Sequence, residues 1–151
     1  MKGSMRVAGA MATMAVALSL LGASEAAAQQ PTLPAEVQEW LERDQARRWA
    51  AMIAEGDSLF NSGSCARCHG QAGSGGRNGP DLADANWVQS DGSLEEIRRT
   101  IFWGVRRELF SDPAWRFEMN PGGGLDLAWE QYASLAAYVW SLSNETGLLG
   151  R

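Results

Sequence analysis

Apolar side chains recur at helical spacing in three stretches of the chain, and no stretch alternates in the manner of a strand. The first stretch begins at Ala35, and its apolar stripe continues through Trp49, Ile53, Gly56 and Phe60. A glycine inside such a stripe costs roughly 1 kcal/mol relative to alanine. It is tolerable where another helix passes close by. We therefore expect a close helix crossing at Gly56.

The second predicted helix begins at Ser93 and the third begins after Asp126. Ser93 with Glu96 three residues later is a capping-box signature, and aspartate is a favourable N-cap residue. Both helices carry an apolar face at helical spacing, made by Leu94, Ile97, Ile101 and Val105 in the second and by Tyr132, Leu135, Ala136, Val139 and Leu142 in the third.

Long glycine-rich segments separate these helices. Residues 70–79, closed by Pro80, have a composition that favours no regular element, and residues 108–124 include three consecutive glycines. Loops of this length in a compact domain usually serve a function. The pattern as a whole predicts an all-α protein in which three or more helices are joined by long, irregular loops.

The first 28 residues have the three-part layout of a secretory signal peptide. Lys2 and Arg6 precede an apolar run at residues 7–21, and Ala26-x-Ala28 provides a cleavage site. This run is shorter than the roughly 20 residues that a membrane-spanning helix needs. The alternative is an uncleaved anchor that uses the neighbouring alanines as extra length. Export predicts a periplasmic protein, free or associated with the outer face of the inner membrane, with its thiols in an oxidising compartment.

Composition narrows the class of protein. The chain has 151 residues, a formal net charge of −5 and an isoelectric point near 4.9. The length suits a single domain, and the acidic balance argues against a nucleic-acid partner. Two cysteines are too few for a disulfide framework or a four-cysteine zinc site. Seven tryptophans require a large flat group, or an unusually aromatic core, to pack against.

The stretch Cys65-Ala66-Arg67-Cys68-His69 matches the C-x-x-C-H pattern of covalent haem attachment. Each thiol can add to one vinyl group of a haem, and the following histidine, the only one in the chain, can donate a nitrogen to the iron. A thioredoxin-like redox pair would need a βαβ context, which the pattern lacks. A zinc site would need a carboxylate ligand, an uncommon structural set. We predict one covalent haem c.

An iron held by one histidine needs a sixth ligand or keeps an open face. The chain has no second histidine, and four of its six methionines lie in the predicted signal peptide. Met52 belongs to the helix that leads into the attachment motif. Met119 lies in a downstream loop and is free to reach the opposite haem face. We predict axial ligation by His69 and Met119; the alternative is that Met119 fills a gap in the core.

Ligation by histidine and methionine raises the reduction potential and leaves no open coordination position. Such an iron passes electrons but does not readily bind or activate a small molecule. We therefore predict a periplasmic electron-transfer protein and not an enzyme. The alternative is a haem enzyme or gas sensor in which Met119 is labile. Binding of carbon monoxide to the reduced protein separates the two.

Residues 54–143 resemble the class I cytochrome c family, and most resemble the cytochrome c domains of the dihaem subunit of C-family haem–copper oxidases. This resemblance implies a class I cytochrome c fold of three to five helices, with long loops wrapped around one covalent haem. The matching positions are Gly56 and Phe60, Cys65-x-x-Cys68-His69-Gly70, Gly79-Pro80-Asp81-Leu82, Trp87, Ser93 to Ile97, Gly104, Met119, and Leu135 to Ser143.

The resemblance also implies roles for individual residues. Gly56 would let the first and last helices cross near Tyr138. The Pro80 carbonyl would accept a hydrogen bond from Nδ1 of His69 and so fix the tautomer of the ring. Trp87 would reach a haem propionate, or else belong to the core.

These observations divide the chain into a signal peptide at 1–28, a helical N-terminal extension at 29–53 and a monohaem cytochrome c domain at 54–147. The extension has no clear family counterpart; it either docks a partner or covers the haem domain. The loop at residues 106–118 is longer than in compact family members.

The expected partners are a redox donor and a redox acceptor, either of them a membrane oxidase or another respiratory complex. The exported part carries a charge of about −6, which predicts a basic docking patch on the partner. An arginine cluster either reverses this charge locally or forms a solvated helix face. Its members are Arg98, Arg99, Arg106 and Arg107.

Overall fold

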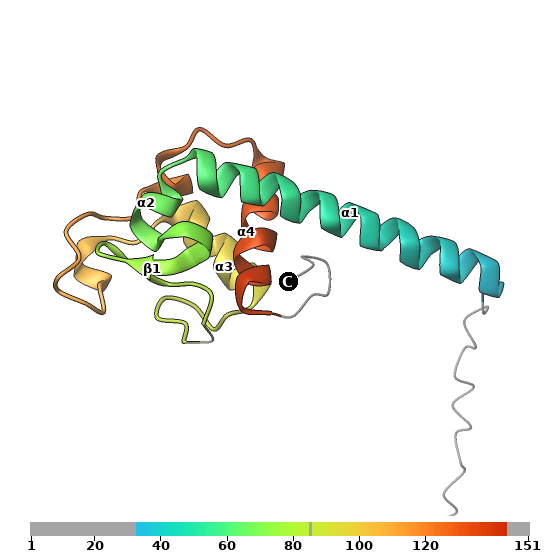
Figure 1. The fold of residues 1–151 in the computed structure, drawn as a ribbon, viewed down its shortest axis with the longest axis horizontal. Helices are drawn as coiled ribbons and strands as arrows, with labels where there is room; N and C mark the ends of the chain where they lie inside the picture. The colour runs from blue at the N-terminus through green and yellow to red at the C-terminus, as the bar shows by residue number, and fades with distance from the viewer. Residues whose placement is uncertain (1–32, 85, 145–151) are drawn as a thin grey trace, which may run out of the picture. The chain divides into compact units, whose positions relative to one another are not determined.

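The computed structural model describes residues 33–84 and 86–144. The predicted signal peptide lies outside the described residues. The described part opens with one long helix, α1 (Ala35–Ser62), of 28 residues (Figure 1). This helix passes without a break through the predicted boundary between residues 53 and 54. The N-terminal extension and the start of the cytochrome domain therefore share one continuous element.

The core forms where α1 crosses α4 (Trp129–Ser143). Gly56 is buried at this crossing, and a Cβ placed on it would overlap the Ser134 carbonyl oxygen and lie only 2.6 Å from the Tyr138 Cβ. The ring of Phe60 packs against that of Tyr138, with centroids 5.3 Å apart. The predicted close crossing at Gly56 is confirmed.

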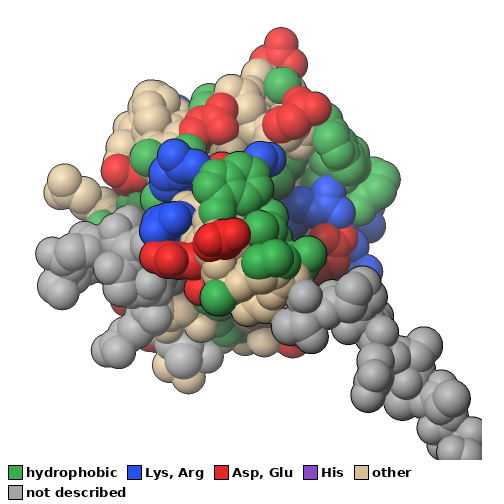
Figure 2. Space-filling model, turned by 90° about the vertical axis from the view of Figure 1, so that its right-hand side faces the viewer, with side chains coloured by type: hydrophobic (Ala, Val, Ile, Leu, Met, Phe, Trp, Pro, Cys, Tyr) green, Lys and Arg blue, Asp and Glu red, His purple; other side chains and the backbone are tan. Residues whose placement is uncertain are grey.

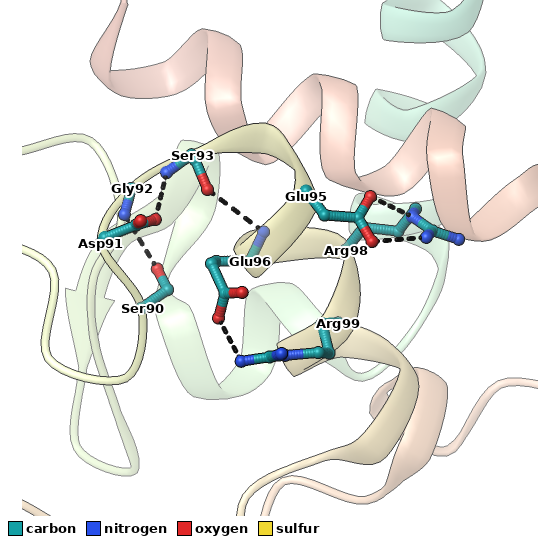
Figure 3. Close-up of polar contacts among 8 residues, drawn as sticks. All are labelled: Ser90, Asp91, Gly92, Ser93, Glu95, Glu96, Arg98 and Arg99. Carbon is teal, nitrogen blue, oxygen red and sulfur yellow. Dashed lines mark hydrogen bonds and ion pairs between the residues drawn. The ribbon is translucent and has the colours of Figure 1, made fainter.

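The third long helix, α3 (Leu94–Trp103), packs against α4 through its buried face. The Ser93 hydroxyl accepts a hydrogen bond from the Glu96 amide at 3.3 Å, as predicted. The return bond of the predicted capping box is replaced, since the Ser93 amide donates to Asp91 Oδ1 at 2.9 Å. The Glu96 carboxylate instead pairs with Arg99 at 2.7 Å (Figure 3).

The Ser93 cap gives a first testable prediction. Replacing Ser93 by alanine is expected to lower the free energy of unfolding by about 1 kcal/mol, because the Glu96 amide loses its acceptor. Urea unfolding of the holoprotein measures the change. The control is Ser58→Ala on the exposed face of α1, which should stay within about 0.5 kcal/mol of the parent. Equal stability of both variants would contradict the cap.

Two predicted helix ends are wrong. Val105 lies beyond α3, because Gly104 has a φ of 70° and ends the helix. Asp126 is not the N-cap of α4, whose N-cap is Ala128. There the side chain of Gln131 accepts the Ala128 amide at 2.9 Å, so an amide oxygen inside the helix supplies the cap.

The glycine-rich segment contains a small antiparallel hairpin where the sequence predicted no regular element. Its strands are β1 (Ser74–Gly76) and β2 (Gly79–Asp81). Ser74 faces Asp81 and Gly76 faces Gly79. The pairing uses main-chain groups, which leave no signature in a run of glycines. The one-turn helix α2 (Cys65–His69) precedes the hairpin, and a short 3-10 helix (Gln71–Gly73) lies between them.

The N-terminal half of α1 is exposed, and every residue from 33 to 43 is accessible to solvent. Its apolar members include Val37, Trp40 and Leu41. Figure 2 views the molecule from the side of this helix end, where hydrophobic side chains lie among arginines and acidic residues. None of the helices in the described ranges combines the length and the apolarity that crossing a bilayer requires.

Candidate functional site

One cavity of about 260 Å³ lies between α2, α3, α4 and the hairpin. It is lined by side chains from distant parts of the chain. All six residues that the sequence analysis named as site residues line it, namely Cys65, Cys68, His69, Pro80, Trp87 and Met119.

The attachment motif is placed by α2. Cys65 and His69 are four residues apart on this helix and therefore share a side, with Cys68 beside them. Both cysteines are free thiols; Cys65 is buried and Cys68 is half-buried. Burial raises the pKa of the Cys65 thiol, and the neighbouring Cys68 adds to the rise. A group bound in the cavity would meet both thiols from the same helix.

The His69 ring is held by the hairpin. Its Nδ1 lies 3.1 Å from the Pro80 carbonyl oxygen. A carbonyl oxygen can only accept a hydrogen bond, so this bond requires the proton on Nδ1. Nε2 is then unprotonated, and its lone pair is free to bind a metal. Burial lowers the pKa of His69, and the bond to Pro80 opposes that change. A Cβ on Gly79 would lie 2.9 Å from Nδ1, so glycine is needed beside the ring.

Met119 is held through its main chain. Its amide and carbonyl pair with the carbonyl and amide of Val105, at 3.0 and 2.8 Å. A Cβ on Gly104 would overlap the Met119 carbonyl oxygen, so glycine is also required by this close approach. Met119 itself is partly buried and packs against the core. The pair brings the thioether segment to the cavity, and packing of the side chain against the core adds to its hold.

The donor set and the walls of the cavity fit a haem. Two free thiols, an imidazole and a thioether line one space, and a Cβ on Gly123 would lie only 3.0 Å from Cys65 Sγ. Among the described residues, no three His, Cys, Asp or Glu side chains are grouped to hold a metal ion. Apolar side chains make much of the wall, including Phe60, Ile97, Ile101, Leu135 and Val139.

The arginine cluster does not form a free basic patch. Arg98 is held by both carboxylate oxygens of Glu95, which lowers the pKa of Glu95 (Figure 3). Exposed pairs of this kind add little stability, but they cancel local charge. The interpretation as a helix face holds for Arg98 and Arg99 only, because α3 ends at Trp103 and Arg106 and Arg107 lie beyond it. Within the cluster, Arg99 also pairs with Glu96 at 2.7 Å and Arg106 with Glu108 at 3.2 Å, whereas the Arg107 side chain donates to the Arg116 carbonyl.

Sequence reasoning missed several residues that line the cavity. Phe110, Asn78 and Gln89 all border it, and none was singled out. Trp115 belongs to the loop at 106–118, which the sequence analysis noted only for its length, and it also lines the cavity. For Phe110 and Trp115 the available signal was the length of the loop at 106–118 and its aromatic content, whereas Asn78 and Gln89 lie outside this loop.

Comparison with known proteins identifies the family of this chain. The family model of cytochrome c matches residues 53–143. The chain belongs to the cytochrome c family. Membership implies a covalently bound haem c, and the mostly helical architecture agrees with the predicted class I cytochrome c fold.

Individual relatives agree with the predicted resemblance to oxidase cytochrome c domains. The chain is 37% identical over 118 residues to the cbb3-type cytochrome c oxidase subunit FixP of Rhizobium etli, covering 78% of this chain and 39% of that protein. It is 33% identical over 132 residues to FixP of Rhizobium meliloti, covering 87% and 44%. It is 41% identical over 59 residues to the cbb3-type cytochrome c oxidase subunit CcoP of Azospirillum brasilense, covering 39% of this chain and 19% of that protein.

This cytochrome spans less than half the length of these curated relatives. No solved structure gives a significant match. The two FixP matches are longer than residues 53–143, and few residues follow that range, so both matches continue into the N-terminal extension. These two relatives thus align with part of the extension, whereas the family model begins only at residue 53.

Proposed function

We propose that this cytochrome carries electrons between redox proteins and is not itself an enzyme. It would bind one haem c through Cys65 and Cys68, with His69 and Met119 as axial ligands. The observation that supports this most strongly is the convergence of both thiols, the imidazole and the thioether on a single cavity. When bound, the haem iron supplies a reversible one-electron change between ferric and ferrous states.

Each residue of the site has a task in this proposal. Cys65 and Cys68 fix the group to the chain. The Pro80 carbonyl holds the proton on Nδ1 of His69, so Nε2 would keep the free lone pair that binds the iron. Met119 would hold the iron through its thioether sulfur and so would leave no position for a substrate. Trp87 borders the same cavity, where we propose that it contacts the bound haem.

We further propose that the protein works in the periplasm, free or at the outer face of the inner membrane. The layout of residues 1–28 supports export. The relatives are subunits of a cbb3-type oxidase by name, which supports a membrane oxidase as one partner. The acidic charge of the chain supports a partner with a basic docking surface.

Expression with fractionation of the cell tests the proposal. The full chain should reach the periplasmic or membrane-surface fraction and gain the mass of one haem that survives denaturation. The reduced protein should bind carbon monoxide slowly and only in part, because Met119 occupies the sixth position. Rapid binding to most of the haem would instead favour a haem enzyme or gas sensor. Absence of added mass would refute the proposal outright.

The role of Met119 gives a second prediction. Met119→Leu is expected to lower the reduction potential, remove the methionine-to-iron charge-transfer band and admit carbon monoxide to the reduced protein. Leucine keeps the volume but has no sulfur to favour ferrous iron. The matched control is Met52→Leu, which changes the partly buried methionine of α1. It should keep the reduction potential, the charge-transfer band and the resistance to carbon monoxide of the parent protein. A band that survives in Met119→Leu would disprove the ligand assignment.

A further inference from the structure

Residues 106–118 form a loop, the aromatic loop, that leaves and returns at one point. Its base is the Val105–Met119 pair, joined by two main-chain hydrogen bonds of 2.8 and 3.0 Å. A loop whose ends lie together and whose own side chains pack is frequently functional. Here the conformation of the loop and the position of Met119 are set by the same pair.

The aromatic loop has an internal structure of its own. The rings of Phe110 and Trp115 meet edge to face, with centroids 6.0 Å apart. The Arg107 guanidinium lies 5.9 Å from the centre of the Phe110 ring, and the Arg107 amide donates to the Glu118 carboxylate at 3.0 Å. These contacts hold the two aromatic rings in a defined arrangement.

Two hydrogen bonds tie the aromatic loop to other segments of the cavity wall. The Gln89 side chain donates to the Leu109 carbonyl at 2.8 Å. The Arg116 amide donates to Asn78 Oδ1 at 3.4 Å, and Asn78 lies in the turn of the hairpin that carries Pro80. In Figure 1 the loop, in orange, lies on the same side as this hairpin. The loop therefore spans from the Met119 segment to the segment that holds His69.

The aromatic side chains of the loop face the cavity. Phe110, Trp115 and Phe117 all line it, as do the tether residues Asn78 and Gln89. Phe110 and Trp115 are half-buried, whereas Phe117 is largely exposed. The inner part of this edge is thus apolar, and it stands between the cavity and solvent.

We propose that the aromatic loop is a fixed cover over one edge of the haem cavity. In this cover Phe110 and Trp115 act as positioning residues that exclude water from the edge. They thereby raise the reduction potential of the haem and keep Met119 in place. The inference rests on the proposed haem ligation by His69 and Met119. The apolar shell around a metal site controls solvent access, local dielectric and hence redox potential. Ferric haem carries one more positive charge than ferrous haem, so a dry edge disfavours the ferric state.

The test measures the haem protein and not its activity with a partner. Trp115→Ala should lower the reduction potential and speed carbon monoxide binding to the reduced protein by about tenfold, which corresponds to about 1.4 kcal/mol. Trp115→Phe keeps a ring and should restore most of both properties. Gln89→Ala cuts one tether without removing a ring, and it should shift both properties in the same direction by a smaller amount.

The control is Trp103→Ala. Trp103 is 70% exposed and does not line the cavity, so its loss should change neither the potential nor the carbon monoxide rate. If Trp115→Ala does not fold with its haem, Trp115→Phe and Gln89→Ala can still be compared with the parent protein, because each preserves most of the loop.

The results separate the cover from the ligation on which it rests. A parent protein without the methionine-to-iron band would refute the proposed ligation. The cover alone would be overturned by a different result. In that result the parent protein shows the band, but Trp115→Ala and Gln89→Ala both leave the reduction potential and the carbon monoxide binding rate unchanged. A potential that falls equally in Trp103→Ala would also overturn it, since the effect would then not belong to the aromatic loop.

Discussion

The double substitution Cys65→Ser and Cys68→Ser is expected to abolish covalent haem attachment. A serine hydroxyl does not add to the haem vinyl groups as a thiol does, so no thioether bond can form. The cavity between α2, α3 and α4, about 260 Å³ in volume, would then stay without its covalently held occupant. The apolar side chains that line the cavity would be left exposed to water, which costs roughly 25 cal/mol per Å² of apolar surface. We therefore expect the chain to lose several kcal/mol of stability and to unfold without a sharp transition.

Mass spectrometry under denaturing conditions and circular dichroism during heating measure these two effects. The single variants Cys65→Ser and Cys68→Ser are the matched controls. Each retains one thiol on α2, so each should keep one thioether bond and an intermediate stability. A double variant that still carries the mass of a haem through denaturation would show that the attachment lies elsewhere in the chain.

The substitution Gly56→Val is expected to lower the free energy of unfolding by about 3 kcal/mol, the upper part of the range for overpacking in a core. A Cβ at this position overlaps the Ser134 carbonyl oxygen and approaches the Tyr138 Cβ to 2.6 Å. The obstacle is partly helix backbone, which cannot rotate out of the way as a side chain can. To relieve the overlap, α1 and α4 must move apart, and the Phe60–Tyr138 contact is weakened with them.

Urea unfolding of the holoprotein measures this loss. The matched control is Ala54→Val, which places the same side chain on an exposed position of the same helix. Its cost should stay below about 1 kcal/mol, the helix-propensity difference between valine and alanine. Similar losses in the two variants would show that the crossing tolerates added volume and would remove the reason for glycine at residue 56.

The helix crossing and the attachment motif were predictable from the sequence because the relevant information is local. The stripe through Ile53, Gly56 and Phe60 repeats at the period of a helix, and its one small residue marks the crossing with α4. The C-x-x-C-H spacing sets Cys65 and His69 on one helical turn. Both patterns depend on residues within a few positions of one another, so a single sequence carries them.

Other features depend on contacts between distant segments and could not be predicted from the sequence. The hairpin at β1 and β2 is held by main-chain pairing, which glycine composition hides. The N-cap of α4 is Ala128 and not the predicted Asp126, and there Gln131 reaches back to the Ala128 amide. The cavity edge made by Phe110 and Trp115 depends on tethers to Gln89 and Asn78, whose partners lie 20 and 38 residues away along the chain.

The main-chain pairing of Val105 with Met119 separates the placement of residue 119 from its chemical identity. Amide and carbonyl groups are common to nearly all amino acids, so a different side chain at this position would be delivered to the same spot. Evolution, or a protein engineer, can thus exchange the side chain at residue 119 in one mutational step while this main-chain pairing is kept.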